Sequence, residues 1–227
     1  METVRSPFLF GLVFLLSLQL ARASSEPDHL LPADRSHDRP YFNLLHKKLV
    51  STPFDYGRII VRPPFTGEYS ISIYAETSRD RVKRYHITMR TAQESLWQAA
   101  LGGVNPSKAE GVKINQTDIF ITSQLAGRLR EVLTAMVDQT RELGADEKPN
   151  RIVIEGPLTD IMIIRRSGRV DEGQMGNFPP TTPKLRLLSK LITSLAQLCN
   201  SPDSKRPYLI TEVTRDTEAL RRQIAGR

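Results

Sequence analysis

The sequence predicts an α+β fold, an antiparallel sheet packed on amphipathic helices, and two patterns carry this prediction. Between residues 54 and 92, apolar and polar residues alternate with a period of two, which is typical of strands with one buried and one solvated face. Residues 122–143 and 182–199 instead repeat apolar residues every three or four positions, which is typical of helices that bury one stripe. Polar connections between the early strands indicate an antiparallel meander.

The first half of the chain supplies a short helical segment and then the strands. Phe42, Leu45 and Leu49 recur at helical spacing, so we expect an amphipathic segment over residues 41–50, ended by Pro53. The predicted strands of this half are residues 58–62, 68–75, 83–89 and 112–121.

Capping residues set the bounds of the two long helices. Thr122 or Ser123 can accept a hydrogen bond from an unpaired amide at the start of the first helix, and Gly144 is expected to stop it after residue 143. Thr182 is expected to cap the second helix, with Pro183 at its first position, where the missing N–H costs nothing. The apolar stripe of this helix includes the only cysteine, Cys199, which is therefore predicted to be a buried thiol and not a nucleophile.

Turn residues and short apolar runs predict the remaining segments. They are a short helix over 91–100, a hairpin of 151–155 and 160–164 around a turn at 156–159, a long loop over 167–182, a strand at 208–210 and a terminal helix at 214–224. In this interpretation the helix over 91–100 places Leu96 and Trp97 inward.

The N-terminal residues are typical of a secretory signal. Arg5 precedes an apolar run over residues 8–20, and Ala21-Arg22-Ala23 offers a small-x-small cleavage site. The run is shorter than the roughly 20 residues that a transmembrane helix needs, so cleavage is expected, with retention as an anchor the alternative. We therefore divide the chain into a signal peptide (1–23), a flexible tether (24–40), a single α+β domain (41–200) and a C-terminal extension (201–227).

Composition limits the classes of partner. The formal charge is +7, and removal of Glu2, Arg5 and Arg22 with the signal lowers it to +6, which favours acidic partners such as anionic polymers. Short basic clusters occur at 79–84 and 165–166, but no long basic run is interleaved with aromatic residues, so a dedicated nucleic-acid module is not expected. One cysteine excludes an intramolecular disulfide.

The best binding candidate in the sequence is the loop that contains Arg165, Arg166 and Arg169. It follows a predicted strand of the hairpin, and the planar guanidinium group suits phosphate and carboxylate oxygens. An exposed charged loop with no ligand is the alternative interpretation. The expected ligand is an envelope protein or an anionic surface polymer.

A catalytic alternative rests on Glu155 and Asp160, which the predicted hairpin turn would bring together. Two close carboxylates can separate their pKa values and act as acid and base on an envelope polymer, as a hydrolase or transferase does. No nucleophile elbow, phosphate-binding loop or paired-cysteine metal spacing occurs, so no cofactor and no metal site is predicted.

The four histidines do not form a predicted site. His29 and His37 lie in the expected tether, where ligands would not be preorganised. His46 and His86 are expected to be exposed, His86 because it alternates with Tyr85 and Ile87 on a strand.

The order of elements resembles a diffuse group of small exported bacterial proteins of unknown function. The landmarks are Leu96-Trp97 and Glu155-Gly156, and the resemblance covers residues 54–199. It implies an α+β domain without an assigned activity. The chain departs from the group in having no lipidation cysteine and in its added residues after Pro202.

Together these observations predict a secreted or periplasmic protein that binds and does not catalyse. The expected role is that of a binding or accessory protein of the cell envelope, with masking or inhibition of a partner as one form of that role. The lack of an assembled catalytic pattern carries this expectation.

Overall fold

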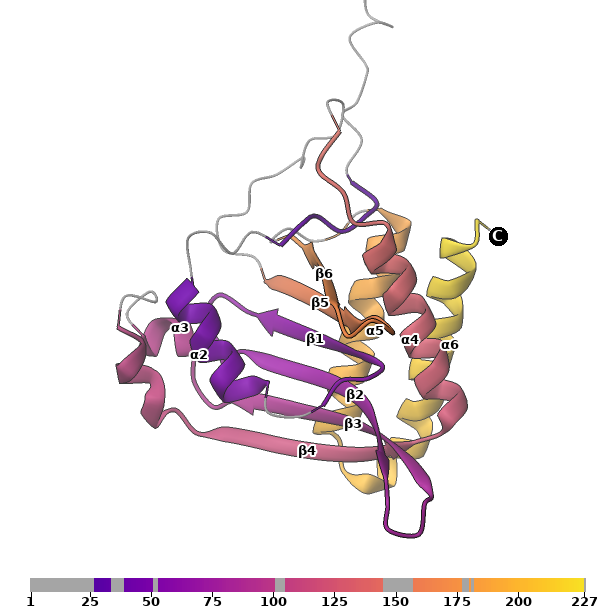
Figure 1. Cartoon of the computed structure of the whole chain (residues 1–227), viewed down its shortest axis with the longest axis horizontal. Helices are drawn as coiled ribbons and strands as arrows, with labels where there is room; N and C mark the ends of the chain where they lie inside the picture. Colours follow the sequence, from indigo (N-terminus) through magenta and orange to yellow (C-terminus); the bar gives the residue numbers. More distant parts are fainter. Residues whose placement is uncertain are drawn as a thin grey trace, which may run out of the picture.

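The computed structural model describes residues 27–33, 39–50, 53–100, 105–144, 157–176, 180 and 182–226. The described helices are α2 (Arg39–Leu49), α3 (Leu96–Ala99), α4 (Ser123–Asp138), α5 (Pro183–Asn200) and α6 (Arg206–Ile224), with 3₁₀ turns η1 (Pro106–Gly111) and η2 (Asp203–Lys205). The described strands are β1 (Gly57–Arg62), β2 (Tyr69–Thr77), β3 (Lys83–Ala92), β4 (Ile114–Ile121), β5 (Leu158–Ile164) and β6 (Val170–Met175). Figure 1 shows them as one sheet, with α4, α5 and α6 grouped together.

The sheet is antiparallel throughout, with the strand order β4-β3-β2-β1-β5-β6. Cross-strand register places Ile59 beside both Ile71 and Ile161, and Ile71 beside Met89. A row of apolar side chains therefore crosses four strands on one face, as the period-two pattern predicts. The predicted α+β fold is confirmed.

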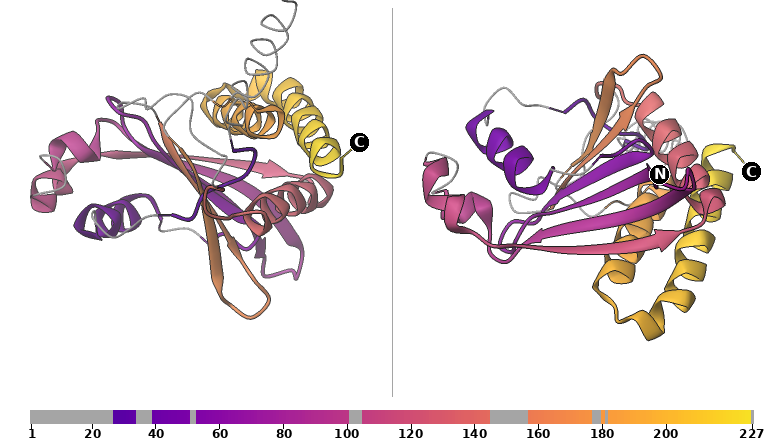
Figure 2. Two further views of the ribbon diagram at one scale, coloured as in Figure 1. Left: turned by 90° about the horizontal axis from the view of Figure 1, so that it is seen from above. Right: turned by 60° about the horizontal axis from the view of Figure 1, so that its bottom comes forward.

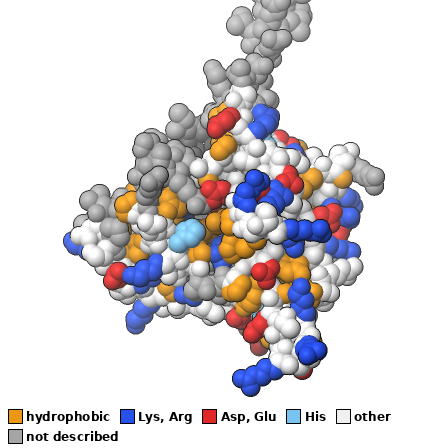
Figure 3. Space-filling model, viewed as in Figure 1, with side chains coloured by type: hydrophobic (Ala, Val, Ile, Leu, Met, Phe, Trp, Pro, Cys, Tyr) orange, Lys and Arg blue, Asp and Glu red, His pale blue; other side chains and the backbone are white. Residues whose placement is uncertain are grey.

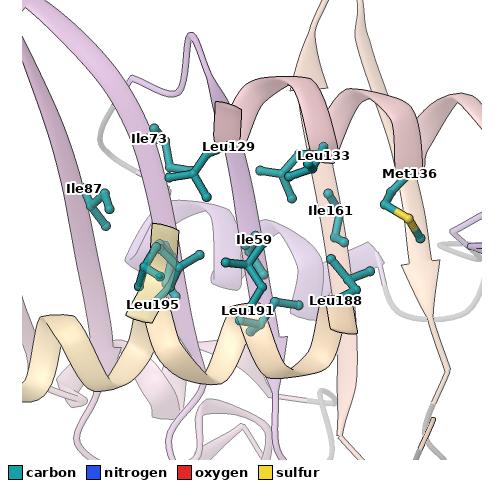
Figure 4. Packing of buried hydrophobic residues seen from close by; sticks show 14 of the residues in the cluster. Ile59, Ile73, Ile87, Leu129, Leu133, Met136, Ile161, Leu188, Leu191 and Leu195 are labelled. Carbon is teal, nitrogen blue, oxygen red and sulfur yellow. The ribbon is translucent and has the colours of Figure 1, made fainter. Parts of the chain in front are cut away.

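The main core lies between this apolar face and helices α4 and α5. Leu129 and Leu133 of α4, and Leu191 and Leu195 of α5, are fully buried in the cluster that includes Ile59. Figure 4 shows these helices directing leucines at the sheet. Each such side chain contributes about 1.5–3 kcal/mol by leaving water. α6 packs on α5 and α4, so it forms a further layer outside them.

The predicted first residues of both long helices are confirmed, but one predicted cap and one predicted end are wrong. The hydroxyl of Thr122 accepts a 3.2 Å hydrogen bond from the Leu125 amide at the start of α4. Pro183 opens α5 after Thr182, but the Thr182 side chain forms no capping hydrogen bond. α4 ends at Asp138, before the Gly144 stop, because the chain beyond it turns to bond residues near the N-terminus. The amide of Arg141 donates to the carbonyl of Leu30 at 3.1 Å.

The flexible tether predicted over residues 24–40 is wrong where the structure describes it, because residues 39–40 begin α2 and residues 27–33 contact the folded domain. Leu30 is fully buried in the main core. Leu31 forms a β-bridge with Gln174 on the outer edge of β6, with N–O distances of 2.8 and 2.7 Å. The segment contains few apolar residues, so its composition alone indicates a disordered tether. It is ordered because Leu30 enters the core and because the backbone of Leu31 is hydrogen-bonded to the edge of β6.

The second strand of the predicted hairpin, residues 160–164, lies within β5, whereas its predicted partner, residues 151–155, lies outside the described residues. The neighbours of β5 are β1 and β6, and β6 occupies residues predicted as a loop. The turn between β5 and β6 contains the predicted arginine loop. Gly168 adopts a φ of 81°, a left-handed conformation that glycine reaches without steric cost, and this turn reverses the chain.

The C-terminal extension belongs to the same folded unit, which corrects the predicted boundary at residue 200. The strand predicted at 208–210 is part of α6, and Val213 and Leu220 of this helix are fully buried in the main core. Helical packing on α5 replaces the strand that the apolar run Tyr208-Leu209-Ile210 indicated. The predicted helix over 91–100 is also shorter, because β3 continues to Ala92 and only Leu96–Ala99 is helical.

The face of the sheet opposite α4 and α5, called here the open face, is covered at one end. There α2 and α3 form a second apolar cluster that includes Tyr41, Leu45 and Leu96. Beyond this cluster the open face carries polar and charged side chains mixed with apolar ones, as Figure 3 shows for the side seen in Figure 1. It ends at the turn between β2 and β3.

Candidate functional site

The turn that joins β2 to β3 projects beyond the sheet and is the most basic exposed turn of the described chain (Figure 1). We call residues 78–84 the hairpin tip. Its four cations stand against a single carboxylate, and all five side chains are exposed: Arg79, Arg81, Lys83, Arg84 and Asp80. Strand pairing continues to Thr77↔Lys83, so paired backbone supports the tip to its base.

A local hydrogen-bond network fixes the shape of the tip. The Ser78 amide donates to the Val82 carbonyl at 3.0 Å, and the Arg81 amide donates to the Ser78 carbonyl at 2.9 Å. The Asp80 carboxylate accepts from the Ser78 hydroxyl and from the Val82 amide, and these bonds hold the pKa of Asp80 below its usual range. The single acid of the tip is therefore occupied in forming the turn.

Arg81 sits at a φ of 62°, in the left-handed region, and no other described non-glycine residue has a positive φ. A side chain other than glycine in this conformation costs about 1 kcal/mol. Glycine or asparagine would form the same turn at lower cost. The chain therefore keeps an arginine where the backbone favours a residue without a cation, and such strain is often found at functional sites.

The arginine charges of the tip are largely uncompensated inside the protein. Among the described residues, Arg79 and Arg81 form no ion pair or side-chain hydrogen bond, and Arg84, which lies near Asp80 and opposite Glu76 of β2, forms an ion pair with neither. Lys83 differs, because its Nζ contacts the hydroxyl of Tyr56 at 3.4 Å, which raises the pKa of Lys83. The tip therefore presents a positive surface.

Aromatic rings flank the base of the tip on the helix side of the sheet. Tyr56 and Tyr85 meet edge to face with ring centroids 5.6 Å apart. Lys83 lies 5.7 and 5.6 Å from these two centroids, and Arg130 of α4 lies 5.5 Å from that of Tyr56. These cation–π contacts arrange rings and cations together at the root of the tip.

A second aromatic group lies on the open face beside the tip. The ring of His86 stacks on Tyr74 with a centroid distance of 5.0 Å and an interplanar angle of 9°, and Phe120 lies 4.6 Å away on its other side. His86 was predicted to be exposed, and this is wrong: it faces away from the core but is only 7% exposed. The neighbouring rings on β2 and β4 cover it, which its own strand pattern cannot show.

The predicted arginine loop has a different environment from the tip. Arg165 forms ion pairs with Asp138 of α4 and, at 2.6 Å, with Asp171, and Arg169 pairs with Asp171 at 2.6 Å. These carboxylates raise the pKa of both arginines. Arg166 is exposed. Since two of the three guanidinium groups are already neutralised, the turn is better suited to joining β5–β6 to α4 than to holding an anion.

Of the alternative catalytic pair, the structure describes only Asp160, because Glu155 lies outside the described residues. Asp160 is buried on β5, where Arg62 approaches its carboxylate to 3.1 Å and the Gln174 amide donates to it at 2.8 Å. A carboxylate held in this way serves the packing of the sheet, and it lacks the solvent access that acid–base work on a polymer requires.

Other candidate groups are accounted for by packing. Cys199 is buried, and burial raises the pKa of its thiol to about 12. His29 is buried, His46 is half-buried on α2, and His37 lies outside the described residues. In the described part of the chain, no three His, Cys, Asp or Glu side chains gather as a metal site. No helix among the described residues is long and apolar enough to span a membrane.

The geometry therefore identifies one surface where positive charge, aromatic rings and backbone strain coincide. No protein family, curated protein or solved structure matches the chain. The basic cluster at 79–84 is visible in the sequence, but the sequence does not show that its arginines lack internal partners while Arg165 and Arg169 have them.

Proposed function

We propose that this chain is an exported, non-catalytic binding protein of the cell envelope that attaches to an anionic polysaccharide through the hairpin tip. The observation that carries the proposal is Arg81, a cation held at a φ of 62° where glycine would be less strained. A turn with no function beyond chain reversal gains nothing from this choice. A turn that binds anions gains a cation at its apex.

The energetics of the tip favour a polymer over a small anion. An exposed ion pair contributes about 0.2–1 kcal/mol, so four cations give at most about 4 kcal/mol, which corresponds to a Kd near 1 mM. A small dicarboxylate would therefore dissociate readily. A polymer with a carboxylate on successive sugars presents many anions at once, and its second and third contacts form at high effective concentration.

The aromatic side chains beside the cations favour a sugar polymer. Tyr56 and Tyr85 are half-buried at the root of the tip, and rings of this kind offer flat apolar surfaces beside phenolic hydroxyls. Such a combination suits a sugar ring, which has both apolar faces and hydroxyl groups. The predicted signal over residues 1–23 supports a location where such polymers occur.

The proposal is tested by binding of the purified exported chain to immobilised polygalacturonate, with fully methyl-esterified polygalacturonate as the uncharged control. We expect binding to the charged polymer at 50 mM NaCl and at least tenfold weaker binding at 300 mM, because added salt shortens the range of exposed charges from more than about 10 Å at the lower concentration to less than about 8 Å at the higher one. Equal binding to the two polymers, or none to the charged one at 50 mM NaCl, would exclude an acidic-polysaccharide site.

A pair of matched variants locates the site. Arg79→Glu reverses one charge on the tip, and Arg166→Glu makes the same change at the exposed arginine of the β5–β6 turn. We expect Arg79→Glu to weaken binding about tenfold, equivalent to about 1.4 kcal/mol, and Arg166→Glu to change it less than threefold. An equal loss in both variants would show that only net charge matters and would contradict a site at the tip.

A further inference from the structure

The two edges of the sheet are not equivalent. The outer edge of β6 is covered by the backbone of Leu31, which exchanges hydrogen bonds with Gln174. At the other edge, β4 pairs with β3, and no described segment pairs with its outer side. The right-hand view of Figure 2 shows β4 as the outermost strand. From this asymmetry and the residues of β4 we infer that two copies of the chain associate through antiparallel pairing of their β4 edges.

The register of β3 and β4 shows which backbone groups face outward. The Gln93 amide donates to the Lys113 carbonyl at 3.0 Å, so residues of β4 with odd numbers direct their amide and carbonyl groups at β3. Hydrogen-bonding direction alternates along a strand. The outward groups therefore belong to Ile114, Gln116, Asp118 and Phe120.

β4 lacks the features by which strand edges usually avoid association. It contains no lysine, arginine or proline, and it is rich in β-branched and aromatic residues. Its one charge, Asp118, accepts a hydrogen bond from the Thr88 hydroxyl of the neighbouring strand. Phe120 is 63% exposed, which is a large apolar area to leave in water.

The residues of β4 select a second copy of the same strand as the occupant. When Thr117 lies opposite Thr117 of the second copy, Ile114 pairs with Phe120 and Gln116 with Asp118, and each pair occurs twice about the two-fold axis. Apolar meets apolar, and an amide donor meets a carboxylate. A shift by two residues in one direction would instead bring the two Asp118 carboxylates together, which like-charge repulsion disfavours. The same shift in the other direction would place each Asp118 opposite the apolar Ile114.

The two-fold axis of such a pair stands perpendicular to the sheet. Both open faces then lie on the same side, and a continuous sheet of two copies results. The hairpin tips lie at opposite ends of this sheet, because the paired β4 strands run in opposite directions. This inference does not depend on polysaccharide binding, since it concerns the backbone edge and not the tip.

The first test uses a proline that removes one outward donor. The amide of Gln116 faces away from β3, so Gln116→Pro leaves the β3–β4 hydrogen bonds intact but blocks pairing with a second copy. Gln116→Ala is the matched control, since it loses the same side-chain contact with Arg90 and keeps the amide. In sedimentation equilibrium at 100 μM we expect dimers for the wild type and Gln116→Ala, and at least tenfold weaker association for Gln116→Pro.

The second test reads the register directly and does not need the proline variant to fold. Thr117→Cys places two thiols opposite each other in a non-hydrogen-bonded pair, where the Cα separation of about 4.5 Å permits a disulfide. Asn115→Cys places them about 13 Å apart along the strands. Crosslinking of Thr117→Cys alone under mild oxidation supports the inference. A monomeric wild type at 100 μM, equal association of both Gln116 variants, or equal crosslinking of both cysteine variants would overturn it.

Discussion

The Tyr41 hydroxyl donates a 2.6 Å hydrogen bond to the carboxylate of Glu68, a residue with no exposed surface. The same carboxylate accepts from the backbone amides of Leu96 and Trp97 at 2.6 and 2.9 Å. It therefore caps α3 from a distant segment and ties α2 to it across the end of the sheet. A buried charge is stable in a protein only when it is bonded in this way.

This relationship predicts the effect of Tyr41→Phe. The variant keeps the ring, which packs 4.9 Å from that of Trp97, and removes only the hydroxyl. Because a hydrogen bond to a charged group contributes about 1.5–3 kcal/mol, the free energy of unfolding should fall by that amount in urea denaturation. Tyr208→Phe, at an exposed position of α6, is the control and should change it by less than about 0.5 kcal/mol.

The parts of the fold that local patterns determine could be predicted from the sequence. Alternation around Ile71 and Ile73 identifies β2 and its buried face, and Thr122 and Pro183 identify the starts of the long helices. These features depend on residues within one element. The corresponding predictions hold because the core is built from the same periodicities.

The candidate site depends on contacts between elements, which local patterns do not show. Arg165 and Arg79 look alike in the sequence, yet only Arg165 meets a carboxylate from another element, Asp138 of α4. Arg58 shows the same limit, because it is buried on the open face under the ring of Phe54, with centroid and guanidinium 4.1 Å apart. Burial lowers the pKa of Arg58 to about 10. Only the assembled sheet distinguishes an available cation from a buried or neutralised one.

Arg81→Gly separates stability from binding at the hairpin tip. Glycine relieves the strain of a φ of 62°, so the free energy of unfolding should stay unchanged or rise by up to about 1 kcal/mol, since the flexible unfolded chain offsets part of the gain. Affinity for polygalacturonate should fall several-fold because a cation is lost. Arg81→Asn retains the turn without the charge and should weaken binding equally. A lower free energy of unfolding in both variants would contradict the inference that the backbone at Arg81 is strained.

Two glycines predict opposite effects of the same substitution. A Cβ added at Gly67 would lie 1.8 Å from the carbonyl oxygen of Ala92, and backbone cannot yield to it cheaply. At Gly127, on the exposed side of α4, it would meet nothing within 4 Å. Thermal denaturation should show Gly67→Ala destabilised by more than about 3 kcal/mol and Gly127→Ala stabilised by up to about 1 kcal/mol. Similar midpoints for the two variants would show that the Gly67 turn relaxes.

The buried thiol of Cys199 predicts how stability depends on pH. Burial raises its folded pKa to about 12, against about 8.5 in an unfolded chain. Between these pH values the unfolded state loses the thiol proton and the folded state keeps it, so deprotonation stabilises the unfolded state. The free energy of unfolding is therefore unaffected by this group below about pH 8.5 and falls as the pH rises towards 12. By pH 10 the loss from this group is about 2 kcal/mol, at up to about 1.4 kcal/mol per pH unit.

Cys199→Ala carries no thiol and provides the comparison. Partly buried tyrosines such as Tyr69, whose pKa is also raised by burial, weaken both proteins at high pH, so the difference between the two proteins isolates the cysteine. Guanidinium denaturation at pH 7, 8.5 and 10 should show Cys199→Ala less stable than the wild type at pH 7, because it leaves a small cavity, with a gap that narrows or reverses by pH 10. A gap that stays constant across this range would mean that the thiol titrates normally in the folded protein and is reached by solvent between α5 and the sheet.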